Sequence, residues 1–371
     1  MIDRTPLAKL SPAAQKALGP GPARMMAARG MAPLAPADQV SVLYQLMIDA
    51  DANLANTAKA TALGLPDRIL ATALGDASLD LRVLDLFGEL VGERPPVFEA
   101  LVQNPTIADE TIAALAGRLG AREADRIAAN EQRLLRHPQI ISAMYLNKAA
   151  RMSTVDRVIE LAVRNNVRVP GLAAWDEIAR ALQTEKPTPS PEIDQTFAIV
   201  AEATQGDDSV LTQGDAEQPP PEEEHDFLND LKNVPLDKMG KLGIPAKIRI
   251  AMLGNAFARA ILIRDPVKIV ALAAVKSPAV TEFEAANYAG NQSLCDDVIR
   301  HIASKREWTK LYGTKYSLCR NPKTPIPEAM RLMPFLREKD LIRLSKSRGV
   351  PSAVVAQARK LLMQRRGGTH K

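Results

Sequence analysis

Cysteine and histidine are scarce in this 371-residue chain, which contains two cysteines and four histidines. Cys295 and Cys319 are too few for a disulfide scaffold, and each lies in an apolar helical pattern that favours a buried free thiol. The histidines are widely separated, and no HxxxH, HExxH or CxxC spacing occurs. The sequence therefore predicts no metal site and no cofactor.

Catalytic sequence motifs are also missing, since the chain has no GxGxxG, no phosphate-binding P-loop and no GxSxG. Adjacent acids such as Asp296 and Asp297 fit the first turn of a helix, where the helix dipole favours negative charge. His137 precedes Pro138 where a helix is expected to begin, which favours a capping or surface role. We therefore expect a protein that is not an enzyme.

Long apolar runs are absent as well. The most apolar stretch, residues 248–275, is interrupted by charges such as Arg249 and Asp265, whereas a membrane span needs about 18 apolar residues in a row. The charges in residues 1–36 are followed by no apolar run, so a secretory signal is not expected. We expect a cytoplasmic protein with no membrane partner.

Aromatic residues make up 4% of the chain and hydrophobic residues 46%, so a core must be built mostly from aliphatic side chains. Small aliphatic side chains allow short helices to pack closely. Apolar residues recur at intervals of three and four, as in residues 107–119 and 155–163, and no strand-like alternation is found. The pattern predicts an all-α fold.

Small polar residues followed by proline punctuate these helical patterns. The five pairs are Asn104-Pro105, His137-Pro138, Asp265-Pro266, Ser277-Pro278 and Asn321-Pro322. Thr281 with Glu284 predicts a capping box, and Thr324 before Pro325 predicts another helix start. Punctuated short helices are typical of repeat arrays, so the sequence predicts an α-solenoid of short helical repeats.

Composition divides the chain further. Residues 1–36, with six prolines, are predicted to be disordered, and residues 37–183 to form a neutral helical repeat domain. Residues 184–224, with eleven acids and one base, are predicted to be an acidic, proline-rich, disordered linker between the two helical segments. An apolar island in this linker, at Phe197, Ile199 and Val200, is either a docking segment or a sticky stretch.

Positive charge is concentrated in the last part of the chain. Residues 225–371 contain 27 bases and 12 acids, a net charge of +15. Residues 225–366 are predicted to form a basic helical repeat domain, followed by a tail at residues 367–371. The basic character therefore belongs to this part alone.

A resemblance to a known family rests on the proline-containing segments. Asn321-Pro322-Lys323-Thr324-Pro325, followed by Met330, Leu332 and Met333, resembles the units of leucine-rich repeat variant proteins. Two further matches are Asn104-Pro105-Thr106-Ile107, followed by Ile112 and Leu115-Ala116, and Ser277-Pro278-Ala279-Val280. A HEAT-like array is the near alternative. The resemblance implies a right-handed superhelix that serves as an interaction scaffold, and it transfers no catalytic residue.

The strongest local feature is a set of aromatic residues among basic ones. Trp308, Tyr312 and Tyr316 recur every four residues and would share one face if a single helix ran through Gly313. Either these rings anchor a partner or stack bases, or they form the core-facing stripe of a repeat helix. The candidate contact residues are Lys305, Arg306, Trp308, Lys310, Tyr312, Lys315, Tyr316, Arg320, Arg331, Arg337, Arg343, Lys346 and Arg348.

We therefore expect a non-catalytic scaffold or adaptor that binds a protein partner, whose identity the sequence does not give. The alternative is a nucleic-acid-binding repeat protein that uses residues 225–366, because a basic stripe binds phosphates with little sequence preference. If it binds no nucleic acid, the basic part of the chain is simply a solvated surface. In a third interpretation the acidic linker occupies the basic domain intramolecularly, as an autoinhibitory or solubilising mimic of nucleic acid.

Overall fold

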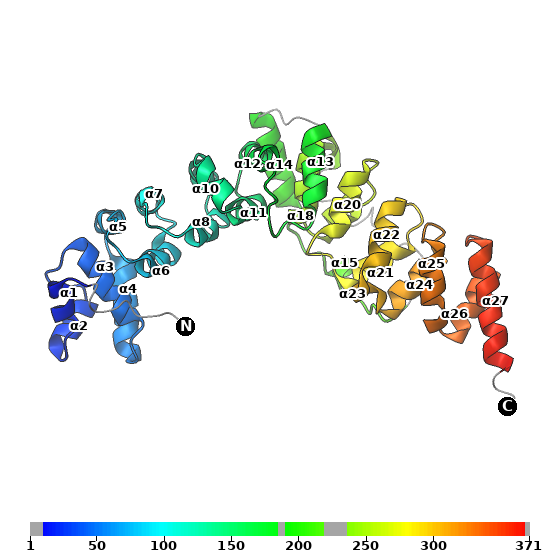
Figure 1. The fold of residues 1–371 in the computed structure, drawn as a ribbon, viewed down its shortest axis with the longest axis horizontal. Helices are drawn as coiled ribbons and strands as arrows, with labels where there is room; N and C mark the ends of the chain where they lie inside the picture. The colour runs from blue at the N-terminus through cyan, green and yellow to red at the C-terminus, as the bar shows by residue number, and fades with distance from the viewer. Residues whose placement is uncertain (1–9, 185–189, 219–235, 368–371) are drawn as a thin grey trace. The chain divides into compact units, whose positions relative to one another are not determined.

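The computed structural model describes residues 10–184, 190–218 and 236–367, and these residues form helices and no strand, which confirms the all-α prediction (Figure 1). The chain divides into two compact units. Unit 1 comprises residues 1–150 and 161–170, and unit 2 comprises residues 151–160 and 171–371. Within the described residues, no helix is both long enough and apolar enough to cross a membrane.

Unit 1 consists of short helices that pack on neighbours close in sequence, as α3 does on α4, α5 on α7 and α8 on α11. This order is what a helical repeat array requires. Its helices are α1 (Pro12–Ala17), α2 (Pro22–Ala28), α3 (Pro36–Met47), α4 (Ala52–Gly64), α5 (Asp67–Leu74), α6 (Leu81–Val91), α7 (Pro95–Gln103), α8 (Asp109–Ala116), α9 (Ala121–Ala128), α10 (Glu131–Arg136) and α11 (Gln139–Leu146).

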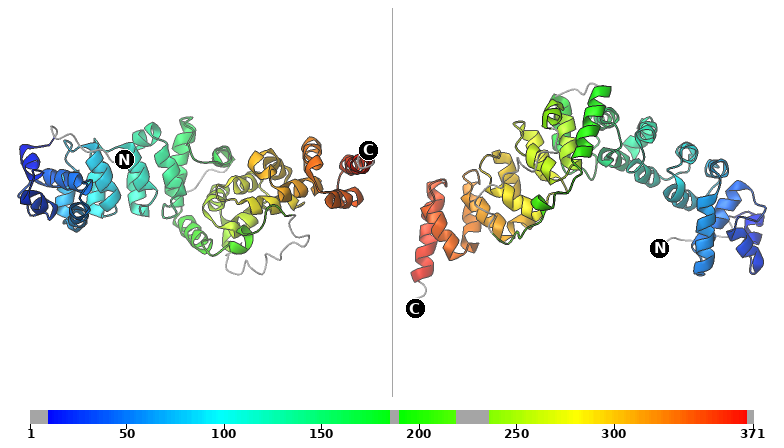
Figure 2. Two further views of the ribbon diagram at one scale, coloured as in Figure 1. Left: turned by 90° about the horizontal axis from the view of Figure 1, so that it is seen from below. Right: turned by 180° about the vertical axis from the view of Figure 1, so that it is seen from behind.

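Unit 2 is built in the same way, with α18 on α20, α20 on α22, α21 on α24 and α26 on α27. Figure 2 shows from two more sides that helices succeed one another in chain order within each unit. The helices are α12 (Met152–Arg164, shared between the units), α13 (Trp175–Thr184), α14 (Pro191–Ala203), α15 (Ser209–Thr212), α17 (Leu236–Lys241), α18 (Ile244–Leu253), α19 (Ala256–Leu262), α20 (Lys268–Lys276), α21 (Glu282–Gly290), α22 (Asp296–Ser304), α23 (Arg306–Thr309), α24 (Tyr312–Arg320), α25 (Ile326–Leu332), the 3₁₀ turn η3 (Met333–Phe335), α26 (Glu338–Lys346) and α27 (Ser352–Gly367).

In three packed helix pairs, a buried asparagine lies at the end of one helix, whether or not a proline follows it. Asn104, Asn147 and Asn321 each cap the C-terminus of a helix: α7, α11 and α24. Each side-chain amide donates to two backbone carbonyls that lie 28 to 32 residues earlier, at the end of the helix packed alongside. The two helices of each pair therefore end side by side and run in the same direction.

The side-chain oxygen of each asparagine stabilises the turn that follows. The Oδ1 atoms of Asn104, Asn147 and Asn321 accept from the backbone N–H two residues on, at 2.9, 2.9 and 3.0 Å. One side chain therefore bonds carbonyls at and just beyond the end of the neighbouring helix and starts a turn that leads to the next helix. Asn147 is followed by Lys148, so proline is not needed for this arrangement.

The core is aliphatic, as the composition predicts. In α20, Ala271, Ala273 and Ala274 are buried, and in α21 Ala285 and Ala289 are buried. Side chains this small permit the close approach of successive short helices, because no rotamer has to be accommodated between them. The prediction of a buried free thiol is confirmed for Cys319, whereas Cys295 is half-buried.

Residues 10–36 are folded, so the predicted disorder is wrong for them, and residues 1–9 lie outside the described residues. Pro12, Pro22 and Pro36 each occupy the first position of a helix. Proline is well suited to this position, because the missing N–H would have no intrahelical acceptor and the fixed φ matches the helix. These prolines start helices rather than interrupt them.

The predicted linker is folded at residues 190–218, and its remaining residues at 185–189 and 219–224 lie outside the described part. Pro191 opens α14, in which Phe197 and Val200 are buried while Ile199 is exposed. The apolar island is therefore a docked helix. Asp194 of α14 accepts from Ser153 N–H at 2.9 Å and Ser153 Oγ at 2.7 Å, which ties the start of α12 to unit 2.

The boundary between the units consequently differs from the one expected at residues 183–184. It falls within α12, after Glu160, and the start of that helix contacts Asp194 of α14 through Ser153 and Arg249 of α18 through Met152. Arg249 of α18 lies under this region, 3.7 Å from Met152 Sδ and 4.6 Å from the centroid of the Phe197 ring. A charged side chain that is fully buried among α12, α14 and α18 was not foreseen from the sequence.

The two predicted helix starts have different outcomes. The Thr281–Glu284 capping box is confirmed, with Glu284 N–H donating to Thr281 Oγ1 at 3.2 Å and Thr281 N–H donating to Glu284 Oε2 at 2.9 Å. The Thr324 cap is wrong, because α25 begins at Ile326 and the Thr324 hydroxyl has no hydrogen-bond partner among the described residues.

Candidate functional site

The aromatic segment of unit 2 contains two helices rather than one. α23 ends at Thr309 and α24 begins at Tyr312, so Trp308 does not share a helical face with Tyr312 and Tyr316. The three side chains are 6%, 7% and 2% exposed. These rings are therefore core residues, and their burial supports the core interpretation over direct contact with a partner.

Trp308 packs at the junction of α22 and α23. Lys305 Nζ lies 4.4 Å from its ring centroid, and the His301 ring meets it edge-on at 6.1 Å. Burial, together with the nearby charges of Lys305 and Lys276, lowers the pKa of His301 from 6.5 to about 4. The imidazole is consequently neutral near pH 7, and its Nε2 atom is buried without a hydrogen-bond partner among the described residues.

Tyr312 joins α24 to α26. Its hydroxyl donates to Asp340 Oδ2 at 2.5 Å and accepts from Arg337 N–H at 2.9 Å. The Arg337 guanidinium carbon lies 4.2 Å from the ring centroid. Burial, followed by the hydrogen bond to the Asp340 carboxylate, raises the pKa of Tyr312 to about 12. The ring therefore positions an exposed arginine on a rigid element.

Phe335 is the exposed aromatic residue that sequence reasoning missed. Its side chain is 65% exposed in the 3₁₀ turn η3, and Lys315 Nζ lies 5.6 Å from its ring centroid. Arg365 donates from Nη1 to the Leu336 carbonyl at 2.8 Å and from Nη2 to the Pro334 carbonyl at 2.5 Å, which clamps the turn from α27. In the sequence, Met333-Pro334-Phe335-Leu336 has the composition of a core segment.

We call Lys315, Phe335, Arg337 and Arg365 the Phe335 patch. All four belong to unit 2, and they come from α24, η3, the turn before α26, and α27. Lys315 and Arg337 form no ion pair with the described acids. The apolar ring therefore lies near two cations, Lys315 and Arg337, whose charge can meet an anionic ligand.

The remaining candidate residues differ in their contacts. Arg331 pairs with Glu328 at 2.5 Å and Arg343 lies 3.9 Å from Asp340 Oδ1, so both partly neutralise acids of their own helices. Arg320 lies over the Tyr316 ring at 5.4 Å. The side chains that are exposed and make no hydrogen bond, ion pair or ring contact with the described part of the chain are those of Arg306, Lys310, Lys346 and Arg348.

A second feature is the segment of residues 204–218, which follows α14, contains one helical turn and one further turn, and which we call the strap. It lies against α19, α21 and α24 of unit 2 and includes the single-turn helix α15. At its start, Asn255 N–H donates to the Thr204 carbonyl at 2.9 Å, and Asn255 Nδ2 donates to the Gly206 carbonyl at 3.0 Å. At its end, Gly313 N–H donates to the Ala216 carbonyl at 2.9 Å.

Two carboxylates of the strap also accept hydrogen bonds from backbone amides of unit 2. Asp208 Oδ2 lies 2.7 Å from Ala256 N, and Glu217 Oε2 lies 3.2 Å from Tyr312 N. Between them, Leu211 packs with Ala256 and Ala260. Part of the predicted acidic linker therefore lies on the basic part of the chain.

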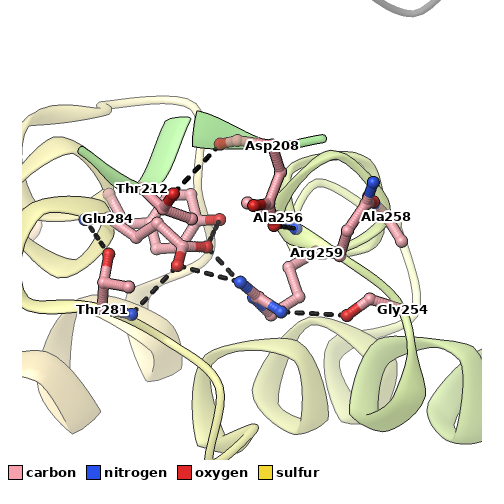
Figure 3. A network of polar contacts seen from close by, with 10 residues as sticks. Asp208, Thr212, Gly254, Ala256, Ala258, Arg259, Thr281 and Glu284 are labelled. Atoms are coloured by element: carbon pink, nitrogen blue, oxygen red, sulfur yellow. Dashed lines mark hydrogen bonds and ion pairs between the residues drawn. The ribbon is translucent and has the colours of Figure 1, made fainter. Parts of the chain in front are cut away.

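A buried ion pair holds the surface beneath the strap together. Figure 3 shows Arg259 of α19 pointing toward Glu284 of α21, with Asp208 of the strap beside Ala256. Arg259 Nε and Nη2 each lie 3.0 Å from a Glu284 oxygen, and both side chains are 2% exposed. Tyr288 Oη donates to Glu284 at 3.1 Å, and Arg259 Nη1 donates to the Gly254 carbonyl at 3.0 Å.

These features define the class of protein as an all-α array of short helices with an exposed basic–aromatic patch and a self-docked acidic segment. No protein-family model, curated protein or solved structure matches the chain significantly. The resemblance to leucine-rich repeat variant or HEAT-like units therefore stays a prediction. Among the described residues, no group of three histidine, cysteine, aspartate or glutamate side chains is placed to hold a metal ion.

Proposed function

We propose that this chain is a non-catalytic helical-repeat adaptor that binds an acidic protein partner through the Phe335 patch. The observation that carries the proposal is the 65% exposed ring of Phe335, with Lys315 5.6 Å from its centroid. Covering a phenylalanine ring gains about 1.5–3 kcal/mol, and aromatic and arginine side chains are enriched among residues that dominate binding.

The rigidity of the patch supports this function. The backbone on either side of Phe335 is held by the two hydrogen bonds of Arg365, and Arg337 is held over the buried Tyr312 ring. Side chains fixed in this way lose little conformational entropy when a partner binds. The uncompensated charge of Lys315 and Arg337 favours a partner whose contact surface is acidic.

Single-stranded nucleic acid is the second candidate ligand. It is favoured by one observation, the placement of a lysine ammonium beside an exposed ring, which would let a base stack while a phosphate meets the cation. Such binding would depend strongly on salt, because phosphate contacts release counterions.

Photocrosslinking tests the adaptor function. The crosslinking residue p-benzoylphenylalanine is placed at position 335 or, as the control, at position 326, where Ile326 is 46% exposed on α25. In source cells, position 335 should give a discrete protein adduct that position 326 lacks, and Arg337→Glu should reduce its yield about tenfold. Equal adducts at both positions, or none at 335, would contradict the proposal.

Fluorescence anisotropy with a labelled oligo-dT of about 30 nucleotides tests the second candidate. Wild-type protein that binds at low ionic strength, with at least tenfold weaker binding for Phe335→Ala than for Ile326→Ala, would favour nucleic acid. If wild type does not bind the oligonucleotide at low ionic strength, the nucleic-acid function is wrong.

A further inference from the structure

We propose that the strap is a built-in occupant of a peptide-binding surface on α19, α21 and α24, and that an acidic segment of a partner protein displaces it. The proposal rests on the adaptor function and goes beyond it, because it assigns a second site, separate in residues from the Phe335 patch, together with the chemistry of its ligand.

The surface recognises the strap largely through its main chain. Three backbone carbonyls of the strap, at Thr204, Gly206 and Ala216, accept hydrogen bonds from Asn255 and Gly313. Every residue carries a backbone carbonyl, so main-chain bonds of this kind are available from another peptide that follows the same path. Affinity for a second peptide of similar shape therefore requires no change in the receiving helices.

Selectivity comes from the two carboxylates. Asp208 accepts from Ala256 N–H and Glu217 accepts from Tyr312 N–H, at opposite ends of the docked segment. A carboxylate bonded to backbone amides makes a stronger bond than a neutral acceptor does. Residues 205–218 contain four acids and no base, whereas residues 225–371 carry a net charge of +15. The ligand that fits is an acidic peptide with two carboxylates at a comparable separation.

Close packing around two glycines places a second requirement on the ligand. Gly214 passes so close to Phe283 that a β-carbon there would collide with the ring. On the opposite side, a β-carbon on Gly313 would lie 2.6 Å from the Ala216 carbonyl oxygen. A competing segment therefore needs a glycine beside Phe283, and any side chain at position 313 would block the surface.

The receiving surface is complete without the strap. The bidentate Arg259–Glu284 pair, the Tyr288 hydroxyl and the Gly254 carbonyl satisfy one another within α19, α21 and the turn between α18 and α19. Removal of the strap would leave this network intact, because none of these bonds involves a strap residue. The helices consequently remain positioned to receive another peptide.

Few buried side chains hold the strap on the surface. Of residues 204–218, Thr204 and Leu211 are buried, Thr204 at the end of α14, and Val210 is 54% exposed. Segments with few buried apolar contacts and exposed hydrogen bonds open at lower free energy than the core. The strap therefore has the properties of a ligand that exchanges with competitors while α19 and α21 stay folded.

Peptide binding to the full-length chain tests the proposal. The probe is a fluorescein-labelled peptide with the sequence of residues 204–218, TQGDDSVLTQGDAEQ. The receptor variant Gly214→Leu expels its own strap from beneath Phe283, so it should bind the peptide at least tenfold more tightly than wild type does. Gly313→Leu, added to Gly214→Leu, should abolish this gain. A peptide carrying Asp208→Asn and Glu217→Gln should bind at least tenfold more weakly.

The contradicting outcomes are equally specific. If Gly214→Leu retains the wild-type circular dichroism spectrum and binds no more tightly than wild type, the surface is not a peptide site. If the carboxamide peptide binds as well as the acidic one, the assigned ligand chemistry is wrong. If unlabelled oligo-dT displaces the peptide more effectively than unlabelled peptide does, the surface prefers nucleic acid and the proposal fails.

Hydrogen exchange on wild-type protein provides a test that needs no variant. The amides of residues 205–218, with those of Tyr312 and Gly313, should exchange at least a hundredfold faster than the amides of α21. Exchange as slow as that of α21 would make the strap a permanent part of the fold. Loss of the position-335 crosslink would contradict the adaptor function without changing either result, so the two proposals can fail separately.

Discussion

The side-chain amide of Asn321 lies 2.9 Å from the carbonyl oxygen of Ala289, 32 residues earlier in the chain. The same nitrogen lies 3.1 Å from the Asn291 carbonyl oxygen, and the asparagine is buried. Because α21 and α24 end side by side, this single side chain satisfies carbonyls that neither helix can satisfy internally. Equivalent bonds are made by Asn104 and Asn147 in unit 1.

Replacement of Asn321 by aspartate should destabilise the protein. The substitution keeps the Oδ1 acceptor of the turn but removes the amide donor and directs a carboxylate toward buried carbonyls, so we expect a loss of about 2–3 kcal/mol in the free energy of unfolding. Urea denaturation measures the loss. Asn291→Asp is the matched control, because Asn291 forms the same turn with Ser293 but sits in a half-exposed position. Equal losses in both variants would contradict this role of the Asn321 amide.

The fold was predicted from the sequence where periodicity determines it. Apolar residues at intervals of three and four gave the all-α class, and the spacing of Thr281 and Glu284 gave a correct helix start. Proline was misinterpreted at Pro12, Pro22 and Pro36, because its effect depends on its position within a helix and the helix boundaries were unknown. The asparagine pattern was obscured because Asn147 has no proline after it.

The site was harder to predict, because exposure is a tertiary property. Trp308, Tyr312 and Tyr316 had the spacing of a contact surface, yet they are buried, whereas Phe335 lies in an apolar segment and is exposed. The strap was assigned to the linker because its composition is acidic and poor in apolar residues. Its hydrogen bonds to Asn255 and Gly313 join residues far apart in the sequence, which no local pattern reports.

Removal of one member of the buried Arg259–Glu284 pair should be strongly destabilising. Arg259→Met leaves an ionised carboxylate that is 2% exposed without its cation, and the expected cost is about 3–5 kcal/mol. Arg259→Met combined with Glu284→Leu should cost less than the two single changes added together, because no lone charge remains. Thermal unfolding gives the values. Arg331→Met, which breaks an exposed pair with Glu328, should change stability by less than about 1 kcal/mol.

Tyr312→Phe should weaken the junction of α24 and α26. The change removes the hydroxyl that donates to Asp340, whose side chain is fully buried, and that accepts from Arg337 N–H. Leaving these groups unpaired should cost about 1–3 kcal/mol in urea denaturation. Tyr316→Phe serves as the control, since its hydroxyl accepts from Arg320 at the longer distance of 3.4 Å. A larger loss for the control than for Tyr312→Phe would refute the assignment.

The buried His301 should make the protein less stable in acid. Burial first, and then Lys305 and Lys276, lower its pKa from 6.5 to about 4, so the unfolded chain binds a proton more readily than the folded one does. Stability is therefore unaffected by this group above pH 6.5, and it falls as the pH drops from 6.5 to 4. Solvent screening of the part-exposed ring limits the expected loss to about 1 kcal/mol.

Urea denaturation of wild type and His301→Gln at pH 7.0, 5.5 and 4.5 measures this contribution. The difference in unfolding free energy between the two proteins should shift in favour of His301→Gln as the pH falls. A difference that stays constant across the three pH values would show that the folded and unfolded chains protonate His301 alike.

Phe335→Ala should leave the stability of the fold nearly unchanged, whereas Phe98→Ala should reduce it. The Phe335 ring is 65% exposed, so its truncation should alter the free energy of unfolding by less than about 0.5 kcal/mol. Phe98 is 1% exposed in α7, and the cavity left by its truncation should cost about 3–5 kcal/mol. Thermal denaturation compares the two. A loss above about 2 kcal/mol for Phe335→Ala would show that the ring supports the fold, and the Phe335 patch would then lose its apolar anchor as a binding surface.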